Sequence, residues 1–158
     1  MSSYTCCSIE SEFSKLVQVD GRIEEADVAA VFDQAKPVQL DFMLGQWEGG
    51  SFNTGHPTHE LLQTNKWAGK TFRTINDVDP IVLYNEVGAR VWCKDYGNAQ
   101  LRAVTFRGVT SAAMIYDNFP IIDSFRYISD TIVIGAMDNK LVPKEAGTYY
   151  FYLRKLNE

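Results

Sequence analysis

The sequence predicts a mainly β fold: a single antiparallel β-barrel of about eight to ten strands, with an N-terminal helix and a short helix after the first strand. Three observations support this prediction. Nine stretches are rich in β-branched and aromatic residues, short turn sequences separate most of them, and one long stretch is rich in helix-forming residues. A single sheet of this length would expose its edge strands, and closing it into a barrel removes those edges.

The length of 158 residues fits one domain with one hydrophobic core. Residues 1–20 show no clear hydrophobic period, so we expect them to form an N-terminal tail or a strap over the barrel. Residues 21–158 are then the barrel domain. The 46% share of hydrophobic residues is too high for a disordered chain.

Charge and hydropathy exclude several classes of partner. The formal net charge of −5 repels phosphate backbones, so we expect no nucleic-acid partner. The apolar runs are far shorter than the roughly 20 residues that a membrane span needs. The first residues also lack the basic start and the apolar stretch of a signal peptide. The sequence therefore predicts a cytoplasmic protein without a membrane partner.

The first predicted element is a helix over residues 23–35. Glu24, Glu25 and Asp27 lie in its first turns, where the helix dipole favours negative charge, and the helix ends before Pro37. Its apolar residues fall on one side. We therefore expect this helix to pack on a sheet.

The remaining elements are mostly strands joined by short connections. The predicted strands are residues 42–52, 70–75, 81–87, 90–93, 100–106, 110–116, 121–128, 131–137 and 148–153. Short connections favour antiparallel pairing of consecutive strands. Between the first two strands, residues 58–65 are expected to form a short helix, with Thr58 as its N-cap and with Leu61 and Leu62 facing inward.

Both faces of the later strands mix apolar and polar residues. In the strand over residues 121–128, Asp123 and Phe125 share one face, whereas Ser124 and Arg126 share the other. One explanation is a barrel interior that holds aromatic and polar groups together, as a ligand cavity does. The other is an outer face covered by the helix and by partner contacts. The sequence leaves both explanations open.

Five separated motifs follow an opening Gly-x-Trp-x-Gly motif at Gly45, Trp47 and Gly49. They are TGHP at 54–57, WAGKTF at 67–72, RAVTFRG at 102–108, YDNFPIIDSFR at 116–126 and GAMD at 135–138. From about Phe32 to the C-terminus, this ordered set resembles the small proteins that pair a GXWXG domain with a DUF4334 domain. The resemblance implies a lipocalin-like barrel of the calycin group. The sequence departs from the family pattern at Ser124, a position where a His is common.

The resemblance places the Gly-x-Trp-x-Gly motif at the start of the first strand. There the Trp47 side chain is expected to plug one end of the barrel. Gly45 and Gly49 would let the strand bend and let other groups approach its backbone. We therefore interpret the three residues as a structural plug, with cavity lining as the alternative for Trp47.

The histidines and cysteines give little support for a bound metal or cofactor. His56 and His59 lack a third nitrogen or sulfur ligand nearby, and the three cysteines lack metal-ligand spacing. We expect His56 to order its loop by hydrogen bonding, or alternatively to contact a ligand, and His59 to be solvated. Haem would need an axial His or Tyr on a late strand, where the sequence offers no His. We predict no cofactor and no metal.

Arg107 and Arg126 are interpreted as side chains that point into the barrel. An arginine desolvated there needs a carboxylate partner, and Asp123 and Asp117 are available. An outer-face position, with the stem covering apolar surface, is an equal alternative for Arg102 and Arg154.

A polar cluster is expected at the mouth of the cavity. Its predicted ligand-binding residues are His56, Arg107, Tyr116, Asp123, Phe125, Arg126, Met137 and Asp138. A carboxylate desolvated against apolar side chains would have a raised pKa and could act as a general acid or base. The alternative is that Asp117 and Asp138 only bond their own backbone in turns.

These observations predict a protein that binds a small apolar or amphipathic molecule inside the barrel. The alternative is a small isomerase or cyclase that acts on an apolar metabolite, with Asp123 or Asp117 as the acid or base. No nucleophile triad, phosphate loop or dinucleotide motif favours an enzyme. The sequence does not decide whether the protein forms a homodimer.

Overall fold

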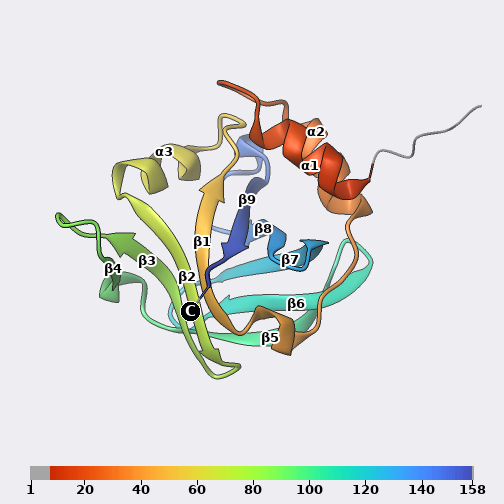
Figure 1. Ribbon diagram of the computed structural model, residues 1–158. Coiled ribbons are helices and arrows are strands. Elements are labelled where there is room, and N and C mark those ends of the chain that lie inside the picture. Colours follow the sequence, from red (N-terminus) through yellow and green to blue (C-terminus); the bar gives the residue numbers. More distant parts are fainter. Residues whose placement is uncertain (1–7, 158) are drawn as a thin grey trace, which may run out of the picture.

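The strands form one antiparallel sheet that curls until its ends meet, in a computed structural model that describes residues 8–157. Residues 1–7 of the expected tail, with Cys6 and Cys7, lie outside this description. The strands of the described chain are β1 (Gly45–Ser51), β2 (Trp67–Thr74), β3 (Asp77–Tyr84), β4 (Arg90–Trp92), β5 (Ala99–Phe106), β6 (Val109–Tyr116), β7 (Ile121–Ser129), β8 (Ile132–Asn139) and β9 (Tyr149–Lys155). Their order is β2-β1-β9-β8-β7-β6-β5-β3-β4, and β2 also pairs with β3. This last pairing closes a barrel-like ring, with β4 outside it (Figure 1).

The predicted fold class is confirmed, with differences at the ends of elements. β1 begins at Gly45 because residues Leu40–Met43 form a 3-10 turn, η1, instead of strand. β3 begins four residues earlier than expected, at Asp77, since it forms a tight hairpin with β2 in which Thr74 pairs with Asp77. Proline is rare in strand interiors, and Pro80 hid this part of β3 from the sequence pattern.

The helices are α1 (Ile9–Val17), α2 (Glu25–Gln34) and α3 (Pro57–Thr64) in the described chain, together with two more 3-10 turns, η2 (Lys94–Tyr96) and η3 (Lys144–Ala146). Where α1 lies, the sequence predicted only a tail or a strap, without a named element. Ser8 caps this helix by accepting a hydrogen bond from the Ser11 backbone, and Phe13 is its buried anchor. None of the described helices is long and apolar enough to span a membrane.

α3 differs from its prediction in its cap and in its inward face. The N-cap is His56 rather than Thr58, because the His56 ring accepts a hydrogen bond from the Thr58 backbone N–H and Pro57 takes the first helical position. Leu62 is buried as expected, whereas Leu61 is 50% exposed. Figure 1 shows α3 at the end of the ring where β1 ends, and η1 at the opposite end.

The ring has apolar contacts on both of its faces. The inner cluster includes Trp47, Phe72, Phe125 and Phe151. The outer cluster joins β7, β8 and β9 to α1 and α2, which lie side by side against the ring (Figure 1). Polar groups of the mixed strands therefore enter the interior, and helices cover part of the outer face.

The Gly-x-Trp-x-Gly motif lies between β1 and its neighbours. The Trp47 side chain is completely buried, and its indole N–H donates a 2.8 Å hydrogen bond to the Met43 carbonyl in η1. Gly45 adopts a φ of 126°, which strongly favours glycine. A Cβ at Gly49 would stand only 2.5 Å from the Trp67 ring. The motif therefore ties Trp47 to η1, and the missing side chain at Gly49 lets Trp67 approach β1.

Candidate functional site

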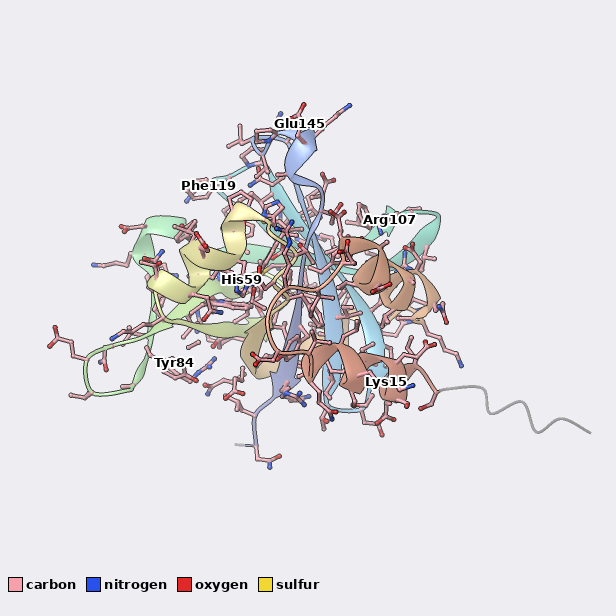
Figure 2. The ribbon with its side chains drawn as sticks, turned by 90° about the horizontal axis from the view of Figure 1, so that it is seen from above. Lys15, His59, Tyr84, Arg107, Phe119 and Glu145 are labelled. Carbon is pink, nitrogen blue, oxygen red and sulfur yellow. The ribbon has the colours of Figure 1, made fainter. Side chains whose placement is uncertain are left out.

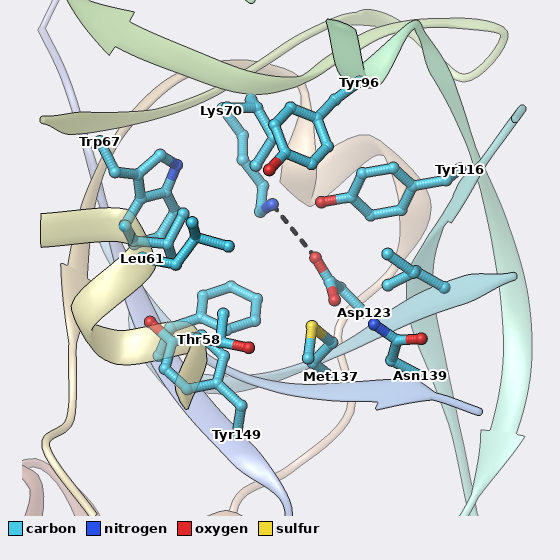
Figure 3. A pocket seen from close by; sticks show the side chains of 14 residues that line it. Thr58, Leu61, Trp67, Lys70, Tyr96, Tyr116, Asp123, Met137, Asn139 and Tyr149 are labelled. Atoms are coloured by element: carbon cyan, nitrogen blue, oxygen red, sulfur yellow. Dashed lines mark ion pairs between the residues drawn. The ribbon is translucent and has the colours of Figure 1, made fainter. Parts of the chain in front are cut away.

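A cavity of about 110 Å³ lies inside the ring beneath α3 (Figure 3). Its walls come from α3, η2 and six strands of the ring. The lining residues are Thr58, Leu61, Leu62, Trp67, Lys70, Ile81, Tyr96, Tyr116, Ile121, Asp123, Met137, Asn139, Tyr149 and Phe151. Most of these side chains are apolar or aromatic, and few are charged. This composition is typical of small-molecule pockets.

Lys70 of β2 and Asp123 of β7 form an ion pair across this pocket. Lys70 Nζ lies 3.1 Å from Asp123 Oδ2, and the two side chains are only 2% and 3% exposed. Nζ also donates a hydrogen bond to the Pro80 carbonyl, 3.0 Å away. Two opposite charges are thus held together where little water reaches them.

Burial shifts the pKa values of Lys70 and Asp123 in the directions that favour their uncharged forms. Loss of hydration lowers the pKa of Lys70, although the nearby Asp123 carboxylate opposes this shift. The same loss of hydration raises the pKa of Asp123 against the effect of the Lys70 ammonium. A proton can therefore pass between the two groups at a smaller cost than it could between the same groups in water.

Asp123 keeps one oxygen without a partner. Its Oδ1 is buried and accepts no hydrogen bond from any of the described residues. A buried carboxylate oxygen without a donor is costly, so this atom is a natural contact for a donor group on a ligand. Figure 3 shows the Tyr96 and Tyr116 hydroxyls turned toward the same pair. Burial raises the pKa of Tyr116 well above its usual value, so that this hydroxyl stays protonated.

Aromatic rings surround the Lys70 ammonium. The centres of the Trp67, Tyr116 and Phe151 rings lie 5.6, 5.8 and 5.2 Å from Nζ. These distances allow cation–π attraction, which is strongest where the cation is desolvated. The rings also give the pocket flat apolar walls.

A hydrogen-bonded chain leads from the pocket toward α3. Ser51 Oγ lies 2.6 Å from the Tyr149 hydroxyl and 2.6 Å from His59 Nδ1. Tyr149 lines the pocket, whereas His59 is partly exposed on α3. His59 is labelled in Figure 2. His59 is therefore not a freely solvated side chain, and burial lowers its pKa.

Three predicted site residues meet in this pocket. Tyr116, Asp123 and Met137 all line it. Phe125 lies in the inner core, where its ring contacts Phe72 and Phe151, and it does not reach the pocket wall. His56 is buried beside the pocket, with its ring 5.5 Å from that of Tyr149.

The expected inward positions of Arg107 and Arg126 are wrong. Arg126 shares the outer face of β7, where its guanidinium donates to the Phe32 and Phe106 carbonyls and lies 4.3 Å from the centre of the Phe32 ring. Arg107 pairs with Asp33 of α2, on the side of the ring that carries the helices (Figure 2). Carbonyl groups and an aromatic ring, rather than Asp123, compensate the burial of Arg126.

Asp117 and Asp138 are also outside the pocket. Asp117 is exposed in the turn after β6, where its backbone N–H donates to the Asn98 carbonyl. Asp138 is exposed and follows Met137 on β8, so that its side chain points to the opposite face. Asp117 thus lies in a turn, as the alternative expected, whereas Asp138 lies within the strand. Ser124 likewise lies on the outer face, next to Asp123 in the chain but not in the pocket.

Lys70 is the site residue that the sequence analysis missed. A single lysine in a strand usually covers an exposed face, and the motif WAGKTF gave no reason to place it inside. One signal was present: Lys70 and Phe72 share a strand face, and Phe72 is strongly apolar. Among the described residues, no group of three or more His, Cys, Asp or Glu side chains could hold a metal ion.

Two family patterns match the chain, one after the other. The pattern of the GXWXG protein family matches residues 30–88, and that of a domain of unknown function, DUF4334, matches residues 97–155. No curated protein matches the chain. A crystal structure of a protein from Thermomonospora curvata is similar, with 38% sequence identity and a TM-score of 0.86. The similarity covers 94% of this chain and 99% of that chain.

Proposed function

This chain belongs to the family of proteins that combine a GXWXG domain with a DUF4334 domain, and we propose that it binds a small apolar or amphipathic molecule inside the ring. The observation that carries this proposal is the Asp123 Oδ1 atom, which has no partner among the described residues and lies in a mostly apolar pocket. A ligand with an apolar body and one hydrogen-bond donor satisfies both parts of this site. The aromatic walls bury the body, and Oδ1 accepts the donor.

The size of the pocket limits the ligand. A cavity of about 110 Å³ is somewhat smaller than the engineered cavity of roughly 150 Å³ that binds benzene. The pocket therefore suits a single small ring, a short branched chain, or the end of a longer molecule that leaves past Leu61. Because Leu61 is half exposed on α3, a small shift of that helix would enlarge the opening.

Two probes separate the apolar and polar parts of this recognition. Toluene offers only a ring, and benzyl alcohol adds one hydroxyl donor. We expect both to bind the wild-type chain when followed by protein-observed NMR, with shifts confined to residues around the pocket. Benzyl alcohol should bind more tightly, because only its hydroxyl reaches Asp123 Oδ1.

Asp123→Asn is the test variant, and Asp117→Asn is the matched control on an exposed turn. Asp123→Asn should reduce the preference for benzyl alcohol over toluene by about tenfold, whereas Asp117→Asn should leave this preference unchanged. Failure of both probes to bind the folded wild-type chain would refute the proposal. If the probes bind, native mass spectrometry of protein from its own source would identify the natural ligand.

A second candidate function is proton transfer on a bound apolar metabolite, with Asp123 as the acid or base. The Lys70–Asp123 pair favours this candidate, because burial moves both pKa values toward the range useful for catalysis. Asp123→Asn should then abolish turnover of the co-purified molecule while toluene still binds. A pure binding protein would show no turnover to lose.

The calycin relationship and the cytoplasmic location belong to this proposal as well. The barrel-like ring with Gly-x-Trp at its first strand supports the former. The cytoplasmic location stays a prediction. A homodimer stays a prediction that size measurement in solution would test.

A further inference from the structure

Lys70 presents an amine to the ligand pocket instead of to solvent. Its side chain is 2% exposed, and it forms part of the wall beneath α3. Among the described residues, Asp123 supplies the carboxylate that lies within ion-pair distance of Lys70 Nζ. The amine, the Asp123 carboxylate and several aromatic rings therefore lie together in one small space (Figure 3).

A desolvated lysine amine is a nucleophile toward carbonyl carbon. Building on the proposed binding function, we propose that Lys70 Nζ forms an imine with a small apolar aldehyde or ketone in the pocket, with Asp123 carrying the protons. The apolar walls would hold the body of the ligand, and its carbonyl group would face Nζ. This inference narrows the ligand class from amphipathic molecules to carbonyl compounds.

The reaction balances with the groups that the pocket contains. One proton passes from the Lys70 ammonium to Asp123, and the freed Nζ lone pair bonds to the carbonyl carbon while the carbonyl π pair moves to oxygen. Asp123 then relays protons from nitrogen to that oxygen, which leaves as water when the C–O bond breaks and the C=N bond forms. The products are a protonated imine, a carboxylate beside it and one water molecule. No oxidant or reductant is needed.

Three features of the site support this step. Asp123 Oδ2 lies 3.1 Å from Nζ, which is close enough for direct proton transfer. Asp123 Oδ1 has no hydrogen-bond partner among the described residues, so it can form a hydrogen bond with the carbinolamine oxygen. Burial also lowers the pKa of Lys70, which increases the fraction of free amine. The carboxylate that remains would pair with the positive imine as it now pairs with the ammonium.

Reductive trapping with benzaldehyde tests the proposal on the full chain. Sodium cyanoborohydride reduces imines and spares free aldehyde, so that mass spectrometry of peptides shows which lysines have gained a benzyl group. The exposed Lys94 and Lys144 serve as reference lysines, because neither of them lines the pocket. We expect Lys70 to be modified at least about tenfold faster than either. Modification of Lys70 no faster than theirs would overturn the proposal.

Asp123→Asn tests the proton relay separately. This variant frees the Lys70 amine from its counter-charge but removes the proton carrier, so we expect slower trapping at Lys70 from about pH 6 to about pH 9. Faster trapping would mean that Asp123 only keeps Lys70 charged, and would overturn its assigned role. Trapping at Lys94 should not change, and Asp117→Asn should trap like the wild type.

Benzyl alcohol distinguishes failure of this inference from failure of the proposed function. It has the ring and size of benzaldehyde but no carbonyl carbon. If benzyl alcohol binds the same preparation and Lys70 remains unmodified, the imine proposal is wrong and the binding function stands. If neither molecule enters the pocket, the binding function is wrong as well.

Discussion

At the scale of single residues, we expect the buried Lys70–Asp123 ion pair to have a large effect on stability. Removing two charges from water is costly, and each partner compensates the other only while both are present. Placing this charged pair in a buried site therefore lowers the stability of the fold. Such a cost is common where a protein needs a reactive or recognition group inside an apolar space.

This cost predicts a clear result for variants of the pair. Lys70→Met should destabilise the fold by about 3–5 kcal/mol, because it leaves a buried carboxylate unpaired. Adding Asp123→Leu should restore most of the lost stability, since the double variant buries no charge. Urea unfolding measures both free energies. A double variant as unstable as Lys70→Met would show that the pair is not the source of the loss.

His56 gives the fold a dependence on pH. Burial lowers its pKa below the ordinary value of 6.5, although nearby Glu25 opposes the shift. As pH falls below about 6.5, the unfolded chain takes up a proton that the folded chain resists, and stability decreases. Above that pH the His56 ring is neutral in both the folded and the unfolded chain, so it does not make the stability depend on pH.

His56→Asn keeps an N-cap on α3 and removes the titrating ring. We expect this variant to lose less stability than the wild type when the pH falls from about 7 to about 5. Urea unfolding at several pH values would measure the difference between the two chains. Parallel pH profiles for them would contradict this assignment.

At the scale of elements, β1 connects the two ends of the ring. It carries the Gly-x-Trp-x-Gly motif at the η1 end and leads into α3 at the pocket end. Turn residues and β-branched runs predicted the strands of the described chain, because both signals are local. The start of β3 was mispredicted because it depends on pairing with β2. The cap of α3 was mispredicted because a ring nitrogen of His56 accepts the capping hydrogen bond.

Trp47→Ala tests the structural role of the motif. The side chain is completely buried and lies outside the ligand pocket, so its loss should cost about 3–5 kcal/mol and leave the benzyl alcohol preference intact. Trp92, which is 40% exposed on β4, provides the control, and Trp92→Ala should cost about 1 kcal/mol or less. Thermal unfolding compares the two. A wild-type melting point for Trp47→Ala would refute the plug.

At the scale of the whole molecule, the closed ring separates two environments. Helices α1 and α2 cover its outer face over β7 to β9, while the inner face keeps a cavity beneath α3. Strand alternation decides which side each residue of β7 joins, so that Asp123 enters the cavity and Arg126 lies under α2. The sequence pattern showed this alternation but not its direction.

The site was predictable only in part for the same reason. Tyr116, Asp123 and Met137 were found because they lie in one motif region next to apolar residues. Lys70 was missed because its partner is about fifty residues away in the chain, on a strand that meets it only across the ring. Contacts of this kind depend on closure, which no local pattern encodes.

A crystal structure of the chain with benzyl alcohol tests the central claim, that the inner pocket is a ligand site, most directly. We predict the ring of the alcohol between Trp67, Tyr149 and Phe151, with its hydroxyl within hydrogen-bond distance of Asp123 Oδ1. A pocket that holds only water at saturating alcohol, or alcohol bound only outside the ring, would contradict the account.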